Sequence, residues 1–201
     1  MSLSDDLFGP VASATPDGSE ILSALRQAAR ERILILDGAM GTEIQQFKFD
    51  EDHFRGDKFI GCACHQQGNN DLLSLSQPAA IEDIHYRYAI AGADILETNT
   101  FSSTVIAQAD YGMEDAVYEL NRMGAQLARR GGQRAEREDG RRRFVAGALG
   151  PTNRTASISP DVNNPGFRAT SFDQLRQAYG EQLRGLIDGG SDIILIETIF
   201  D

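Results

Sequence analysis

Hydrophobic residues follow two patterns along the chain, short unbroken apolar runs and longer segments with apolar residues three or four positions apart. Unbroken β-branched and leucine runs are typical of strands in parallel sheets that are covered on both faces, and the wider spacing is typical of amphipathic helices. Strands are predicted at 33–36, 94–96, 144–150 and 192–197, and helices at 20–32, 78–92, 114–130 and 171–188. This alternation predicts βαβ units and an α/β fold with a parallel sheet.

Boundary residues support several of these elements. Pro78 suits the first turn of a helix, and Gly92 ends that helix before the next strand. Ser171 and Gln174 form a capping-box pattern. The charged segment 129–143 is predicted to be a solvated turn, and residues 1–19, which are rich in Ser, Asp, Pro and Gly, are predicted to be a flexible tail.

Polar residues follow each predicted strand, at the carboxyl end where the active sites of parallel α/β folds lie. They are Asp37, Glu97-Thr98-Asn99, the stretch 147–153, and Glu197-Thr198. For Asp37, Thr98 and Thr198, a helix cap or a loop hydrogen bond is an alternative role. If Asp37 and Glu197 share one rim, they form an anionic site for an ammonium group, and the glycine-rich "DGAMGTE" offers backbone N–H groups to a carboxylate. Together they suit an α-amino acid.

Composition and charge narrow the function classes. The net charge of −11 and the pI near 4.7 oppose binding to nucleic acid or to an anionic membrane. No apolar run approaches 18 residues, and no Lys or Arg precedes Arg26, which argues against a membrane span and a signal peptide; a cytoplasmic location is expected. Cys62 and Cys64 are too close in sequence for a disulfide and lack a second metal-binding cluster, so we expect two reduced thiols in a loop.

Three stretches carry a family resemblance: "ILILDGAMGTEIQ", "GNNDLLSLSQPAAIEDIHYRYAIAGADILETNTF" and "VAGALGPTNRTASISPDVNNPGFR". They resemble the homocysteine-binding domain of cobalamin-dependent methionine synthases over roughly residues 30–201. The third stretch is the most specific, because its long loop is unlike the shorter one of betaine and S-methylmethionine homocysteine methyltransferases. The resemblance implies a (β/α)8 TIM barrel of the homocysteine S-methyltransferase type, with residues 20–201 forming an incomplete domain that contains about the first half of the barrel.

The resemblance also implies roles for particular residues. Asp37 and Glu197 match the acids that hold the homocysteine amino group, and backbone amides around Gly38 and Ala39 would meet its carboxylate. Thr98 and Asn99 match residues that line the same mouth.

The cofactors and partners implied are those of the intact enzyme, in which zinc-bound homocysteine takes a methyl group from methylcobalamin. Other domains recharge the cobalamin from 5-methyltetrahydrofolate. The family's three zinc cysteines are expected beyond Asp201, so this chain alone is predicted to hold no metal and to be inactive.

Two alternatives stay open: a betaine- or S-methylmethionine-type homocysteine methyltransferase, and a noncatalytic fragment or binding module. A doubly wound nucleotide-binding domain is disfavoured, because the first predicted strand–helix turn lacks a G-x-G-x-x-G motif.

Overall fold

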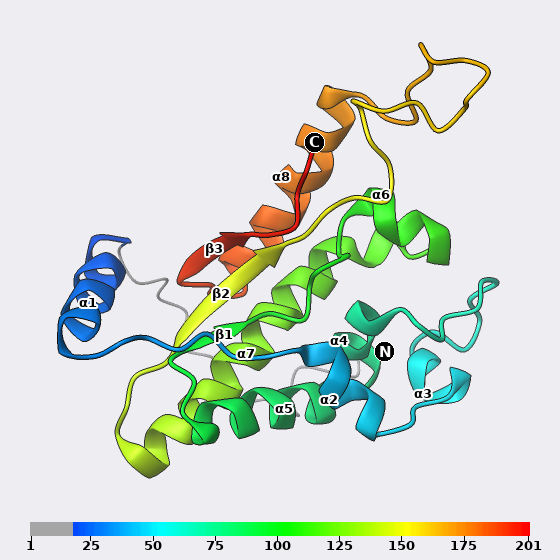
Figure 1. Ribbon diagram of the computed structural model, residues 1–201. Coiled ribbons are helices and arrows are strands. Elements are labelled where there is room, and N and C mark those ends of the chain that lie inside the picture. Colours follow the sequence, from blue (N-terminus) through cyan, green and yellow to red (C-terminus); the bar gives the residue numbers. More distant parts are fainter. Residues whose placement is uncertain (1–17) are drawn as a thin grey trace.

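The computed structural model describes residues 18–201 (Figure 1). The helices are α1 (Gly18–Glu31), α2 (Met40–Gln46), α3 (Glu51–Arg55), α4 (Leu73–Ser76), α5 (Pro78–Ala91), α6 (Val105–Gln108), α7 (Val117–Asp139) and α8 (Phe172–Asp188). The 3-10 helices are η1 (Asn70–Leu72), η2 (Ala109–Tyr111) and η3 (Glu114–Ala116), and the strands are β1 (Ile95–Glu97), β2 (Phe144–Leu149) and β3 (Ile193–Ile196). The predicted tail lies mostly outside the described residues, except that Gly18 and Ser19 begin α1.

The sheet is parallel, in the order β1-β2-β3, as the βαβ pattern predicts. Ala146 of β2 is in register with Glu97 on one side and with Ile193 on the other. Because all three strands run in the same direction, the residues that follow them lie at one edge of the sheet.

The predicted strand 33–36 is confirmed only in part, because it pairs with β1 but is not one of the three strands of the sheet. It forms a single parallel bridge from Leu36 to Ile95, although backbone hydrogen bonds from Asp94 and Ile95 to the Ile35 carbonyl hold it beside β1. Its apolar side chains were expected to be covered, yet Ile33 is 85% exposed. The segment lies at the edge of the sheet, where no other described strand pairs with its outer side.

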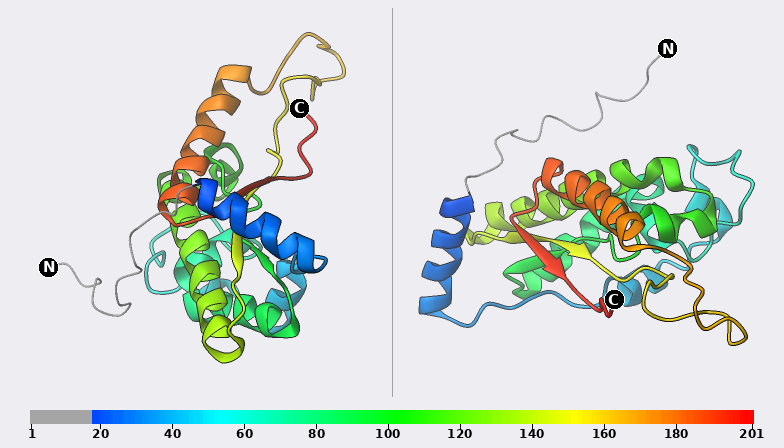
Figure 2. Two further views of the ribbon diagram at one scale, coloured as in Figure 1. Left: turned by 90° about the vertical axis from the view of Figure 1, so that its left-hand side faces the viewer. Right: turned by 90° about the horizontal axis from the view of Figure 1, so that it is seen from above.

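Helices α5, α7 and α8 pack on one face of the sheet, with α7 in contact with both of the others (Figures 1 and 2). Leu96 and Val145 point toward this layer and join the alanines of α5 and α7 in a buried cluster. The described residues place no comparable helical layer on the opposite face, and they do not close the sheet into a barrel. The structure therefore confirms the α/β class with a parallel sheet.

Helix α7 continues nine residues beyond the predicted end at Arg130, through much of the segment expected to be a turn. The reason is packing against α5: a Cβ atom on Gly131 would lie 2.7 Å from the Cβ of His85 and 2.9 Å from the Glu82 carbonyl oxygen. The glycine thus allows the two helices to approach closely, and the helix ends only at Gly140, which has φ 72°.

The expected capping box at the start of α8 is confirmed, since the Ser171 side chain accepts from the Gln174 N–H and the Gln174 side chain accepts from the Ser171 N–H. The following strand, β3, is less covered than its apolar sequence predicts, and Ile196 is 69% exposed. Like the segment 33–36, β3 lies at an edge of the sheet and has only one described neighbour.

Arginines pair with two buried aspartates where the strands begin. Asp94 binds Arg32 at 2.5 Å and Arg141 at 2.8 Å, and it also accepts from the Ile35 N–H at 2.9 Å. Asp192 repeats the arrangement with Arg129 at 2.5 Å and the Val145 N–H at 2.8 Å. Each aspartate therefore clamps the start of its own strand to the neighbouring segment, 33–36 for Asp94 and β2 for Asp192.

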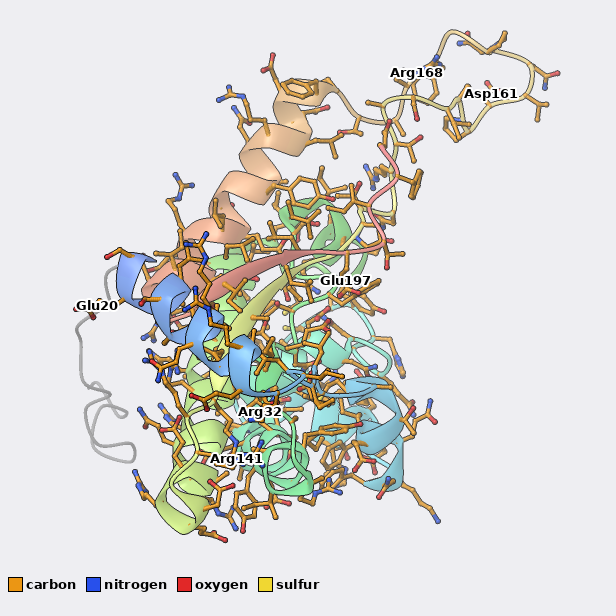
Figure 3. All side chains as sticks on the ribbon, turned by 60° about the vertical axis from the view of Figure 1, so that its left-hand side comes forward. Glu20, Arg32, Arg141, Asp161, Arg168 and Glu197 are labelled. Atoms are coloured by element: carbon orange, nitrogen blue, oxygen red, sulfur yellow. The ribbon has the colours of Figure 1, made fainter. Side chains whose placement is uncertain are left out.

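The loop 150–171 projects past the other end of the strands, as the labels for Asp161 and Arg168 show (Figure 3). None of the described helices combines the length and the apolar composition needed to cross a membrane.

Candidate functional site

A cavity of about 560 Å³ lies where the strands end. Its walls come from the segment after Leu36, the ends of β1 and β3, the loop 98–102 and residues around η1. Among the residues that the structure describes, four carboxyl groups and no Lys, Arg or His side chain line it; the acids are Asp37, Asp71, Glu97 and Glu197. The cavity is therefore suited to a cationic group.

Asp37 is held by the neighbouring strand instead of capping a helix. Its two carboxyl oxygens each lie 3.1 Å from the backbone nitrogen of Glu97, which donates to them. Helix α2 begins at Met40, with Ala39 as its N-cap, so the alternative role of Asp37 as a helix cap is wrong. Burial raises the pKa of Asp37 to about 7, although hydrogen bonds from the backbone N–H groups of Glu97 and of Asp37 itself act to lower it.

Glu197 lies at the same cavity, as the sequence predicted. Its backbone N–H donates to the Leu149 carbonyl oxygen at 3.1 Å, which continues the pairing of β3 with β2. Its Oε1 atom is buried and accepts no hydrogen bond from any described residue. Thr198 then adopts φ 54°, a left-handed conformation that is rare for a β-branched residue and turns the chain directly after the acid.

Glu97 is a site residue for which the sequence predicted a place at a strand end but no role. It lies at the end of β1, and its carboxyl group is within hydrogen-bonding reach of Glu197. Burial, then Glu197 and then Asp37 raise its pKa to about 8. The available signal was the repeat of Asp, apolar strand and Glu-Thr in "ADILET" and "SDIILIET", which gives both glutamates equivalent positions.

Thr98 and Asn99 line the cavity, but the Thr98 hydroxyl and the Asn99 side-chain nitrogen are already bonded to neighbouring segments. The Thr98 hydroxyl oxygen accepts from the Ala148 N–H at 2.9 Å and lies 2.6 Å from the Thr100 hydroxyl. The Asn99 side-chain nitrogen donates to the Asn70 carbonyl oxygen at 2.8 Å. These contacts support the second alternative for Thr98, a structural hydrogen bond, and they fix the loop after β1 against η1.

Gly38 and Ala39 also line the cavity. No described acceptor receives a hydrogen bond from either backbone N–H, so both are available to a ligand. The Tyr88 ring packs beneath Gly38, where an added Cβ would lie 3.0 Å from a ring carbon, and the Tyr88 hydroxyl donates to the Ala39 carbonyl oxygen at 3.2 Å. A side chain at position 38 would thus displace Tyr88 and the turn that it supports.

Asp71 and Tyr111 extend the cavity on the side of η1, and neither was predicted from the sequence. Asp71 is buried and accepts from the Ser102 N–H, with its two oxygens 3.2 and 3.4 Å from that nitrogen. Burial raises its pKa to about 7. No local sequence pattern marks Asp71, because its place in the cavity depends on how the loop after β1 folds over η1.

The described residues do not fit the zinc ion that the family resemblance implies. Cys62 and Cys64 are free thiols in the loop between α3 and η1, where Cys64 is exposed and Cys62 packs beside Leu72 and Leu75. Over residues 18–201, no group of three His, Cys, Asp or Glu side chains is arranged to hold a metal ion. The loop position of the two thiols agrees with the sequence-based expectation.

Comparisons with known proteins agree with this architecture. Two crystal structures of the homocysteine methyltransferase MmuM from Escherichia coli share the fold: the metallated form has a TM-score of 0.65 at 22% identity, and the oxidized form 0.63 at 24% identity. The matches cover 87% and 85% of this chain but only 57% and 55% of those structures, so the chain spans little more than half their length. The homocysteine S-methyltransferase family model matches residues 34–201, and the chain therefore belongs to the homocysteine S-methyltransferase family.

Proposed function

We propose that this chain supplies the homocysteine-binding site of a methyltransferase. One observation carries the proposal: Asp37, Glu97 and Glu197 converge on a single cavity that has no basic side chain among its described lining residues. Carboxyl groups gathered in this way attract a cation, and the α-ammonium of homocysteine is such a group.

In the proposed complex, Asp37 and Glu197 bind the ammonium group. The Oε1 atom of Glu197, buried and without a described partner, gains a donor, and the positive charge favours the ionised form of Asp37. The free N–H groups of Gly38 and Ala39 receive the homocysteine carboxylate. Thr98 and Asn99 keep the loop after β1 in place and act through position rather than through direct contact.

For the methyl donor we propose methylcobalamin, recharged from 5-methyltetrahydrofolate by cobalamin and folate domains of a longer protein. The support is the sequence resemblance of residues 145–168, which includes the long projecting loop. Because residues 18–201 fit no metal ion, we assign no catalytic step to zinc here and expect the 201-residue chain alone to transfer no methyl group.

Binding of L-homocysteine to the purified chain, measured by titration calorimetry, tests the proposal. Glu197→Gln should weaken binding about 10- to 100-fold, because a hydrogen bond to a charged group contributes roughly 1.5–3 kcal/mol. Asp161→Asn, in the exposed projecting loop, is the matched control and should leave the affinity unchanged. Equal affinities for wild type and Glu197→Gln would refute the assigned role.

A second ligand sharpens the test. 4-Mercaptobutanoic acid keeps the thiol and the carboxylate of homocysteine but lacks its ammonium group. It should bind far more weakly to the wild-type chain, and Glu197→Gln should change its affinity little.

Methyl donors are compared by methionine formation in the protein that contains the downstream segments, with methylcobalamin, betaine and S-methylmethionine supplied in turn. Turnover with betaine or S-methylmethionine alone would reject the cobalamin assignment.

A further inference from the structure

Glu97 and Glu197 approach one another across the middle strand of the sheet. Register places Glu97 beside Ala146, and side chains in register point to the same face. Leu195 is in register with Ala148, so Glu197, two residues further along, also belongs to that face. Glu197 is level with Gly150, four residues beyond the level of Glu97, and the residues of this face between the two levels are the small Ala146 and Ala148. Both acids line the same cavity.

The surroundings of this pair supply further acids and no counter-ion. Asp37 faces the pair from the segment beside β1, and the remaining titratable groups of the cavity wall are Asp71 from η1 and Tyr111 from η2. Tyr88, on α5, lies beneath the adjacent turn. No Lys, Arg or His among the described residues lines the cavity. Two ionised carboxylates in contact there would repel each other without compensation.

We propose that Glu97 and Glu197 share one proton when the cavity is empty, and that an ammonium group entering the cavity displaces this proton into water. The proton explains how two carboxyl groups lie within hydrogen-bonding reach, since one of them must donate. Burial and the neighbouring acids raise the pKa of Glu97 to about 8, and this direction agrees with a shared proton.

The displacement step balances in atoms and charge. The O–H bond of the shared proton breaks heterolytically, the proton passes to water, and an N–H group of the ammonium then donates to the carboxylate that is left. No bond of the ligand changes. The ammonium as occupant rests on the proposed function, whereas the shared proton is a property of the free chain and is tested without any ligand.

Carboxyl-carbon NMR of the free chain, labelled with carbon-13 at glutamate, tests the shared proton. The signal missing from Glu97→Gln identifies Glu97, and in the wild type it should titrate near pH 8. Glu197→Gln should move this midpoint down by at least one pH unit, whereas the control Glu114→Gln, at an exposed position of η3, should not move it. A midpoint below pH 6 in the wild type overturns the proposal.

Calorimetry with L-homocysteine at pH 7.5, in phosphate and in Tris, tests the displacement. The difference in heat between the two buffers should correspond to release of between one half and one proton per ligand bound. Glu97→Gln should reduce this release to the smaller part that Asp37 supplies while still binding the ligand. Binding without proton release overturns the displacement and leaves the proposed function standing. Absence of binding overturns the proposed function and the displacement together, and the NMR titration still decides whether the proton is shared.

Discussion

Acidic residues occupy both ends of the sheet, but their surroundings are opposite. Where the strands begin, Asp94 and Asp192 are each paired with arginine and with a backbone N–H of the neighbouring segment. Where the strands end, Asp37, Glu97 and Glu197 face a cavity that has no basic lining residue in the described chain. Figure 3 shows Arg32 and Arg141 close together near one end, with Glu197 toward the other.

The pKa values of Asp94, Asp37 and Glu97 follow the same division. Burial opposes ionisation of Asp94, but Arg32, the Ile35 N–H and Arg141 outweigh it and lower the pKa. Burial instead dominates at Asp37 and Glu97 and raises the pKa of each. Groups that are compensated within the protein contribute to stability, and groups left uncompensated in a cavity are suited to binding. The acids thus fall into two groups: the scaffold acids Asp94 and Asp192, which are paired with arginines, and the site acids Asp37, Asp71, Glu97 and Glu197, which line the cavity.

The largest effect is expected from removing a scaffold acid. Asp94→Ala leaves Arg32, Arg141 and the Ile35 N–H without their shared acceptor, and it should lower the free energy of unfolding by about 3 kcal/mol. Urea unfolding followed by circular dichroism measures this change, with Asp161→Ala in the exposed loop as the control. A loss below about 1 kcal/mol would contradict the clamp.

The pH dependence of stability should reveal the site acids next. The folded chain has raised pKa values at Asp37, Asp71 and Glu97, so between about pH 5 and pH 8 it binds more protons than the unfolded chain. Stability should therefore fall by at least about 2 kcal/mol as the pH rises through this window. The contribution of Asp94, whose pKa is lowered, is complete in this window and is lost only at more acidic pH.

Urea unfolding at intervals from pH 4 to pH 9 measures this dependence. A stability that stays constant or rises between pH 5 and pH 8 would show that the acids at the strand ends are compensated after all.

A smaller effect of opposite sign is expected from neutralising one site acid. Glu97→Gln removes the cost of ionising a partly buried carboxyl group, so it should stabilise the chain by about 1 kcal/mol at pH 8 and hardly at all at pH 5. The same unfolding measurement at the two pH values tests this. Destabilisation at pH 8 would place Glu97 with the scaffold acids.

The smallest effect is expected at an exposed ion pair outside both groups. Arg154 and Asp110 lie 3.8 Å apart with both side chains about half exposed. Arg154→Ala should change the free energy of unfolding by less than about 0.5 kcal/mol. A loss comparable to that of Asp94→Ala would mean that ion pairing alone, without burial, accounts for the scaffold effect.

Local patterns predicted the elements whose signals lie within their own sequence. The helix from Pro78 and the capping box at Ser171 depend on neighbouring residues, and both were found. The parallel order, and with it the meeting of Asp37 and Glu197 at one cavity, follows from βαβ topology. Asp71 could not be predicted in the same way, because the loop around Ser102, 31 residues later, brings it into the cavity wall.

The errors in the fold have a common cause, since they depend on what each segment packs against. Residues 33–36 have the composition of a covered strand but lie at an edge. The charged segment after Arg130 resembles a turn, yet Gly131 and Gly132 are buried and α7 continues through them. Composition reports what a segment could bury, and only the tertiary arrangement determines whether a neighbour is present.

The aspartate clamps at the strand starts also govern where the acids emerge. Glu97 is three residues after Asp94, and Glu197 is five residues after Asp192, so each separation is odd. Because successive residues of a strand point to opposite faces, an odd count turns the glutamate to the face opposite its clamp. Inserting a single residue in β1 would leave Asp94 with its arginines but rotate Glu97 toward the helices. The number of residues between each aspartate at a strand start and the glutamate at that strand's end therefore determines the site as much as the acids themselves do.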